Sequence, residues 1–227
     1  MAAVERDVRL LMLAASAGSA DAWSYFGLGH AFVANMTGNT VILGLAVFQN
    51  HGDMLHPAIA LGCYAAGAML GSLFTRKVQP GAVWARAISW TLMLEAFLLL
   101  AAEAGWIAIH LHINHSPSLE VLLSTLALAI GMQSGAMVQL KIPGIVTTYI
   151  TGTWTTMVTG LVRLGRQEQQ QTQETEKRLA MQAAVLTAYF LSAVLAGWLF
   201  RHQPLAVGAL PGLSVLLVAV HGLIFND

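Results

Sequence analysis

Two short polar motifs interrupt otherwise apolar segments of this chain, and their residue types suit the binding of a small solute or ion. Their members are Thr37, Gly38 and Asn39 in the first motif and Thr151, Gly152 and Thr153 in the second, about 114 residues further on. Glycine lets the backbone leave helical geometry, and threonine and asparagine offer short donors and acceptors. A helix that starts after such a break presents free N–H groups and a positive dipole end. The motifs therefore predict a ligand or ion pathway, although small hydroxylated residues also serve in plain helix packing.

Two carboxylates and one amide lie inside segments that are otherwise apolar. Asp21 lies in the outer half of the first segment and Glu95 in the middle of the fourth, where an unpaired ionised carboxylate costs several kcal/mol. We expect Asp21 to bond to a side chain or amide of the first break, either in the pathway or as a cap for the following helix. Glu95 has no basic residue three or four positions away, so proton coupling and a buried hydrogen bond to another helix both stay open. Gln133 is a candidate to line the same cavity, whereas Glu103 is expected to be solvated at the membrane edge.

Catalytic and cofactor chemistry find no support in the sequence. No set of nucleophile, histidine and acid occurs within the apolar segments, so we expect no enzymatic activity and no cofactor. The single cysteine, Cys63, excludes an internal disulfide and a cysteine-rich metal site. His110 and His112 are two positions apart, which puts them on different helix faces. They predict a solvated loop, and no metal site is expected.

The composition is that of an integral membrane protein. Hydrophobic residues make up 56% of the chain and charged residues 10%, with a mean hydropathy of +0.66. Soluble domains carry about 25% charged residues, so the expected surroundings are a lipid bilayer. The net charge is zero, which gives nucleic-acid binding no electrostatic support.

Eight apolar segments are long enough to enter a bilayer as helices. They cover residues 8–28, 31–49, 57–75, 83–106, 118–140, 145–163, 179–200 and 204–225. Strands of a membrane barrel would alternate polar and apolar residues, and these segments do not. The clearly aqueous stretch, residues 163–178, joins the sixth and seventh segments.

The positions of the eleven lysines and arginines favour one topology over another. Eight crossings would leave six cations inside and five outside, although membrane proteins usually concentrate them in the cytoplasm. If segments 31–49 and 145–163 instead return to the side they came from, ten cations are cytoplasmic and only Arg201 is outside. These two segments are the ones that carry the Thr-Gly motifs. The predicted fold class is therefore all-α, with six full transmembrane helices plus two re-entrant or broken segments, and with both termini cytoplasmic.

The motifs also predict an internal repeat, with residues 1–113 as one membrane repeat and residues 114–227 as the other. Each repeat would cross an odd number of times, so the copies would be inverted and the breaks would approach the midplane from opposite faces. Eight full crossings with dual topology are the alternative, because such a protein also has balanced charges, and both breaks would then be kinks. Gly67 and Gly71, one helical turn apart, predict close packing within the protomer. A homodimer is compatible with the sequence, which holds no specific evidence for it.

Several of these motifs are shared with a known family. They are Gly18 and Asp21, Phe32-Val33-Ala34-Asn35, Thr37-Gly38-Asn39, Gly131-Met132-Gln133, Thr147-Thr148-Tyr149 and Thr151-Gly152. Through them nearly the whole chain resembles the YoaK-type bacterial membrane proteins, a family of unknown function. Ser134 and Thr153 depart from the pattern, since the family tends to have asparagine at both positions. The resemblance implies a multi-pass protein of the bacterial inner membrane, and it supplies no substrate.

The sequence favours a small transporter or channel, in which an unknown small solute or ion passes a site at the paired Thr-Gly breaks. The alternative is a membrane protein without transport activity, such as a scaffold, an accessory subunit or a sensor. The surroundings of Thr37 and Thr151 discriminate between them. Both residues line a polar cavity in a transporter, and both pack dry against apolar side chains in a scaffold.

Overall fold

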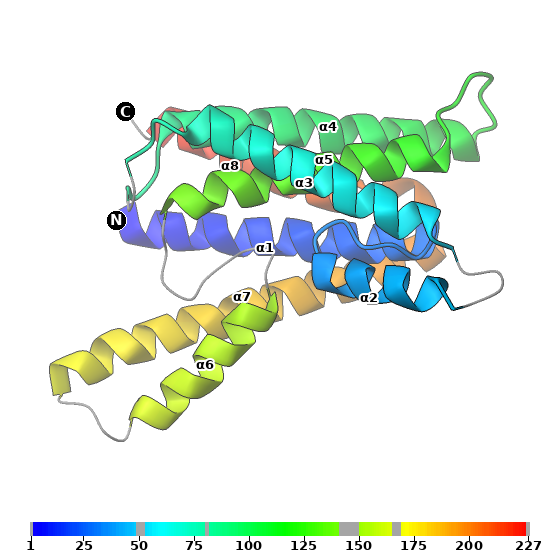
Figure 1. Ribbon diagram of the computed structural model, residues 1–227. Helices are drawn as coiled ribbons and strands as arrows, with labels where there is room; N and C mark the ends of the chain where they lie inside the picture. The colour runs from blue at the N-terminus through cyan, green and yellow to red at the C-terminus, as the bar shows by residue number, and fades with distance from the viewer. Residues whose placement is uncertain (1, 49–52, 80–81, 141–149, 165–168, 226–227) are drawn as a thin grey trace.

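The computed structural model describes residues 2–48, 53–79, 82–140, 150–164 and 169–225. Within these residues the chain forms eight α-helices and two short 3-10 helices (Figure 1). The α-helices are α1 (Ala2–Gly27), α2 (Met36–Ala46), α3 (Leu55–Thr75), α4 (Arg86–His110), α5 (Leu119–Met137), α6 (Ile150–Leu164), α7 (Gln169–His202) and α8 (Ala209–Phe225). The prediction of an all-helical chain is confirmed, and each of the eight apolar segments overlaps one helix.

Some sequence predictions fall outside the described residues. The segment expected over 145–163 begins there, so the first described residue of its helix is Ile150. The family-typical Thr147, Thr148 and Tyr149 lie outside as well, as do the cations Lys141 and Arg166.

Five helical stretches among the described residues are long and apolar enough to cross a membrane, by length and composition. They are Leu55–Thr75, Arg86–His110, Leu119–Leu140, Gln173–His202 and Pro204–Phe225. Helix α1 also has the length of a span, with 26 residues, but it carries Asp21 and three buried serines and does not belong to this apolar set. The protein is therefore a helical membrane protein with at least five candidate spans in its described part.

Over the residues that the structure describes, two helices are too short to span a bilayer. Helix α2 has 11 residues and α6 has 15, whereas a crossing takes about 20. In Figure 1 each of them begins beside the middle of the bundle, and they run toward opposite ends of it. The N- and C-terminal ends of the chain lie at the end toward which α6 runs.

The long helices pack in a regular set of pairs. Helix α1 packs along α7, α3 along α5, and α4 along α8, with further contacts of α1 with α8 and of α4 with α5. The short helices lie outside this bundle, with α2 against α3 and α6 against α7. The hydrophobic core is formed mainly by α1, α4, α5 and α8, and α5 is the most enclosed of the candidate spans.

Glycines allow α3 and α5 to approach until their backbones touch. A Cβ atom on Gly67 would collide with the backbone carbonyl of Leu128, and one on Gly131 would collide with the carbonyl of Tyr64. Gly71 and Gly135 lie against backbone carbonyls in the same way, one turn further along. The predicted packing role of Gly67 and Gly71 within the protomer is therefore confirmed.

We expect Gly67→Ala to destabilise the protein by about 1–3 kcal/mol, because the added methyl group forces the backbones of α3 and α5 apart. The measurement is thermal unfolding of the purified protein in detergent. Gly62→Ala is the matched control in the same helix, since no atom lies within 4 Å of its added Cβ. Equal melting temperatures for the two variants would contradict the close contact.

Candidate functional site

The chain between α1 and α2 is held by one buried carboxylate. Asp21 Oδ1 accepts hydrogen bonds from the backbone N–H groups of Val33 at 2.8 Å, Ala34 at 2.6 Å and Asn35 at 3.4 Å. Only 3% of Asp21 is exposed. Buried N–H groups outside a helix need an acceptor, and Asp21 supplies it from the preceding helix. Of the partners expected for Asp21, the backbone amides of the break are the ones found.

Asn39 makes a second clamp on the same stretch. Its Oδ1 accepts from the N–H of Phe32 at 2.8 Å and its Nδ2 donates to the carbonyl of Phe32 at 2.6 Å. The side chain of Asn39 is fully buried. Asn39 therefore satisfies both backbone groups of Phe32, and its role in the described structure is to shape the break.

The first turn of α2 is capped by its own sequence. Asn35 Oδ1 accepts from the N–H of Gly38 at 3.0 Å, the usual geometry of an N-cap. A Cβ on Gly38 would lie 2.9 Å from the ring of Phe32, so glycine is required for this close approach. The sequence predicted free N–H groups at this helix start. The N–H of Gly38 is not free, because it donates to the side chain of Asn35.

The second motif forms the first turn of α6. Thr153 is buried, whereas the side chain of Thr151 is exposed. The carbonyl of Gly152 accepts from Thr156 Oγ1 at 2.9 Å, and the same hydroxyl accepts from Gln182 Nε2 of α7 at 2.9 Å. This hydrogen bond joins the N-terminal half of α6 to α7, and α2 packs against α3.

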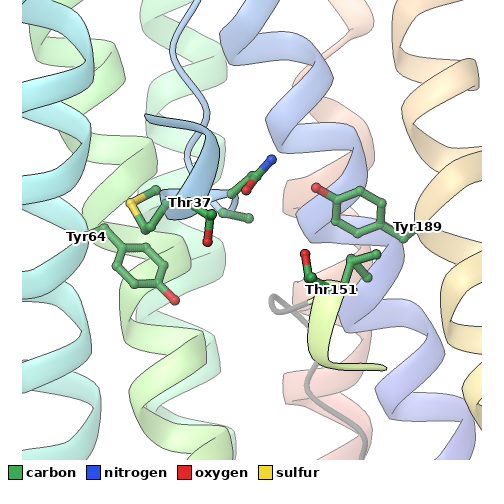
Figure 2. A pocket seen from close by; sticks show the side chains of 8 residues that line it. Thr37, Tyr64, Thr151 and Tyr189 are labelled. Atoms are coloured by element: carbon green, nitrogen blue, oxygen red, sulfur yellow. The ribbon is translucent and has the colours of Figure 1, made fainter. Parts of the chain in front are cut away.

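The two helix starts meet at one cavity of about 210 Å³. It is lined by Ala34, Asn35, Met36 and Thr37 at the first break, by Ile150 and Thr151 at the second, and by Tyr64 and Tyr189. Figure 2 shows Thr37 beside Tyr64 on one side, with Thr151 beside Tyr189 on the other. None of these lining residues is charged, and hydroxyl groups supply most of their polar chemistry. The volume is below that of typical drug-sized pockets, about 300–1,000 Å³, so the cavity suits a small solute.

The two cavity tyrosines are held by equivalent contacts in two helix pairs. The hydroxyl of Tyr64 in α3 donates to Ser134 Oγ of α5 at 2.8 Å, and the hydroxyl of Tyr189 in α7 donates to Asp21 Oδ2 of α1. The backbone carbonyl of Tyr64 lies against Gly131, and that of Tyr189 lies against Gly18. In each pair a glycine thus brings the backbones together, and a polar residue three positions later holds the tyrosine.

Sequence reasoning missed both tyrosines. They lie in apolar segments, in the stretches CYAAG and AYFLS, and the glycine motif that begins at Gly67 was interpreted only as helix packing. The signal that could have found them is a phenol inside an apolar segment, since a buried Tyr hydroxyl usually needs a hydrogen-bond partner.

The other candidates lie away from the cavity lining. Gln133 is fully buried and donates from Nε2 to the carbonyl of Leu13 at 3.3 Å, which joins α5 to α1. Glu95 is fully buried in α4. Of the nine candidate residues, only Thr37 and Thr151 line the cavity. Asp21, Gly38 and Asn39 shape the first break. Gly152 and Thr153 belong to the first turn of α6.

The prediction for Glu103 was wrong. This residue is 6% exposed, and its Oε2 accepts from the N–H of Gly208 at 3.0 Å. The carboxylate therefore binds the backbone at the start of α8, where a helix N-terminus attracts negative charge. Its position near the edge of the predicted segment 83–106 suggested solvent, but α4 continues to His110 and the packing of α4 along α8 buries Glu103.

Apolar helices of spanning length, with a polar cavity among them, define a membrane protein. The chain belongs to the family described as "Protein of unknown function (DUF1275)", which matches residues 9–221. It is 32% identical over 158 residues to the UPF0700 transmembrane protein YoaK of Bacillus subtilis (strain 168), an alignment that covers 67% of this chain and 65% of that relative. The YoaK-type resemblance is thus confirmed. No solved structure matches the chain.

We expect Tyr189→Phe to destabilise the protein more than Tyr64→Phe. A hydrogen bond to a charged group contributes about 1.5–3 kcal/mol and a neutral one about 0.5–1.5 kcal/mol. Tyr189 donates to a carboxyl group and Tyr64 to a hydroxyl. Unfolding in detergent, followed by circular dichroism for both variants, measures the difference. A larger loss for Tyr64→Phe would contradict the role of Asp21 as the stronger anchor.

Proposed function

We propose that this protein is a small transporter or channel of the bacterial inner membrane, and not an enzyme. The observation that carries the proposal is that Thr37 and Thr151, 114 residues apart in sequence, line the same cavity. Broken helices that meet at a polar cavity are typical of transport folds, where irregular backbone is tolerated only around such a space. The cavity volume and its uncharged hydroxyl-rich lining favour a small solute or ion as the cargo.

The bundle is proposed to consist of two inverted repeats, residues 1–113 and 114–227. The pairing of helices supports this, because the most extensive helix contacts have counterparts when the halves are exchanged, whereas the smaller contact of α3 with α4 has none of similar extent between α7 and α8. The exchange replaces α1 by α5, α2 by α6, α3 by α7 and α4 by α8. The pair α1–α7 then corresponds to α5–α3, the pair α1–α8 to α5–α4, and the pair α2–α3 to α6–α7. Helix α4 packs on its own counterpart, α8. The equivalent contacts of Tyr64 and Tyr189 follow the same exchange.

The proposed topology has six full crossings, with α2 and α6 as half-helices that do not cross. The direction of the helices supports it: α2 and α6 start near the middle and run to opposite ends (Figure 1). Arg76 and Arg86 flank the connection between α3 and α4, at the end that carries both chain termini, and Arg201 lies in the last turn of α7, toward the other end. The excess of cations makes the end with the termini cytoplasmic.

Cysteine labelling tests this topology. In a Cys63→Ser background, Gln79→Cys and Glu174→Cys are expected to be protected from a membrane-impermeant maleimide in intact cells, and Ser116→Cys and Gln203→Cys to react. All four side chains are exposed in the structure. Eight crossings in one orientation would place positions 79 and 174 on opposite sides, and a dual-topology protein would label partially at every position.

Transport is tested by substitutions that keep the shape of the cavity and remove its hydroxyl groups. We expect Thr37→Val and Thr151→Val each to slow solute passage about tenfold, the equivalent of one lost hydrogen bond of about 1.4 kcal/mol. The measurement is osmotic swelling of proteoliposomes, followed by light scattering, with a panel of small neutral and anionic solutes.

Thr40→Val and Thr155→Val are the matched controls. Both threonines are exposed on α2 and α6, bond to their own helix backbone and do not line the cavity. Their proteoliposomes should swell like the wild type. If no solute passes through the wild-type protein, the non-transport alternative of a scaffold, accessory subunit or sensor gains the support that this proposal loses.

A further inference from the structure

In the described part of the chain, Glu95 is a carboxyl group in the core of the bundle without a hydrogen-bond partner. It is 0% exposed, and neither of its carboxyl oxygens has a hydrogen-bond partner among the described residues. Asp21 and Glu103, the other buried carboxyl groups, both accept from backbone N–H groups. Glu95 therefore differs from them in having no visible role in holding the fold.

The register of α4 on α8 places Glu95 against an apolar stretch. Near one end of this pair, Ser89 lies against Gly222, and further along Leu100 lies against Gly212. Because the two helices are antiparallel, Glu95 falls level with the α8 turn that contains Val215 and Ala219, both buried. On its own helix face, Leu92 and Leu99 are fully buried hydrophobic residues, and the buried Thr91 donates its hydroxyl to the carbonyl of Ala87 in the same helix.

Glu95 also lies at the depth of the cavity, with α5 between them. Gly105 of α4 lies against Leu122 of α5, so the antiparallel register brings Glu95 level with the α5 turn that contains Gln133. The same turn also contains Gly131, which lies against the backbone of the cavity residue Tyr64. A change of charge at Glu95 would therefore act on the helix that holds a cavity tyrosine.

The other titratable groups on the helices packed against α4 have partners of their own. His221 of α8 accepts a hydrogen bond from Arg9. Glu120 of α5 lies 4.0 Å from His56 of α3. Tyr64, also in α3, donates to Ser134. Cys63 of α3 is a free thiol. On α4 itself, Arg86 begins the helix and His110 ends it, and Glu103 binds the N–H of Gly208. None of these groups is bonded to Glu95.

Neither protonation state of Glu95 is stabilised by its surroundings. An ionised carboxylate in an apolar interior loses its hydration and gains no counter-charge, and a neutral carboxyl keeps an O–H group without an acceptor. Leucine or methionine at this position would pack equally well without either cost. A side chain that costs stability in both states fits a functional role better than a structural one.

We propose that Glu95 binds and releases a proton at the depth of the cavity. This would make Glu95 the proton-coupling group of the transporter, a role that rests on the transport function proposed above. In the loading step a proton from water adds to a carboxylate oxygen, and in the release step the same O–H bond breaks. No electrons are transferred, and the proton is the only ligand required.

Infrared spectroscopy of the purified wild-type protein tests the proton site directly. The C=O band of a protonated carboxylic acid should be present at neutral pH, absent in Glu95→Gln and unchanged in Glu120→Gln, whose carboxyl group is partly exposed on α5. The band should weaken as the pH is raised, and it should shift in D₂O. A wild-type spectrum without this contribution from Glu95, or a band that neither titrates nor exchanges, would overturn the proposal.

Proteoliposome swelling at several pH values separates this proposal from the transport function. We expect the rate in the wild type to depend on pH and that dependence to be lost in Glu95→Gln. If Glu95→Gln transports with the wild-type rate and pH profile, proton coupling is wrong and transport stands. If the wild type moves no solute although the Glu95 band titrates, transport and coupling fail together and only the proton site stands.

Glu95→Leu supplies a readout that does not depend on transport. This variant should melt at a higher temperature than the wild type, because it removes a buried carboxyl group that bonds to no residue the structure describes. A lower melting temperature would indicate that Glu95 stabilises the fold and would count against a purely functional role.

Discussion

The carboxyl group of Asp21 is the interaction on which the described cavity depends. Its two oxygens join three parts of the chain: α1, the non-helical stretch before α2, and Tyr189 of α7. Inside a membrane, backbone N–H groups outside a helix have no water to bind, so a break is stable only where the protein supplies acceptors. With that acceptor in place, α2 can start beside the middle of the bundle. Thr37 then reaches the cavity instead of the membrane surface.

Close packing at glycines sets the position of the cavity walls. Gly131 and Gly18 bring the backbones of α3 and α7 against α5 and α1, and this contact fixes where Tyr64 and Tyr189 leave their helices. The two helix pairs use the same geometry with different chemistry, because one tyrosine donates to a hydroxyl and the other to a carboxyl group. A cavity with chemically unequal walls provides a physical basis for distinguishing its two sides.

Buried polar side chains differ in whether they hold irregular backbone. Asp21, Asn39 and Glu103 each bond to backbone groups and shape the fold at a helix start or break. Glu95 bonds to none of the described residues and lies one helix away from the cavity. Asp21, Asn39 and Glu103 explain how a small chain keeps irregular backbone within an apolar bundle. At Glu95 the gain or loss of a proton would have the largest effect.

Much of this architecture follows from the sequence alone. Segment length and apolar composition determined the helices, because a helix is the form that satisfies its own backbone in lipid. The Thr-Gly motifs pointed to two breaks, but Thr37, Gly38 and Asn39 lie in the first turn of α2, and the non-helical stretch precedes them at residues 28–35. Only the tertiary structure decided what each polar side chain does. The motif members separated into Thr37 and Thr151 at the cavity and Asn39 in a backbone clamp, because neighbouring positions on a helix face different surroundings. The partners of Tyr64, Tyr189 and Glu103 lie 70, 168 and 105 residues away in sequence, and no local pattern encodes contacts of that range.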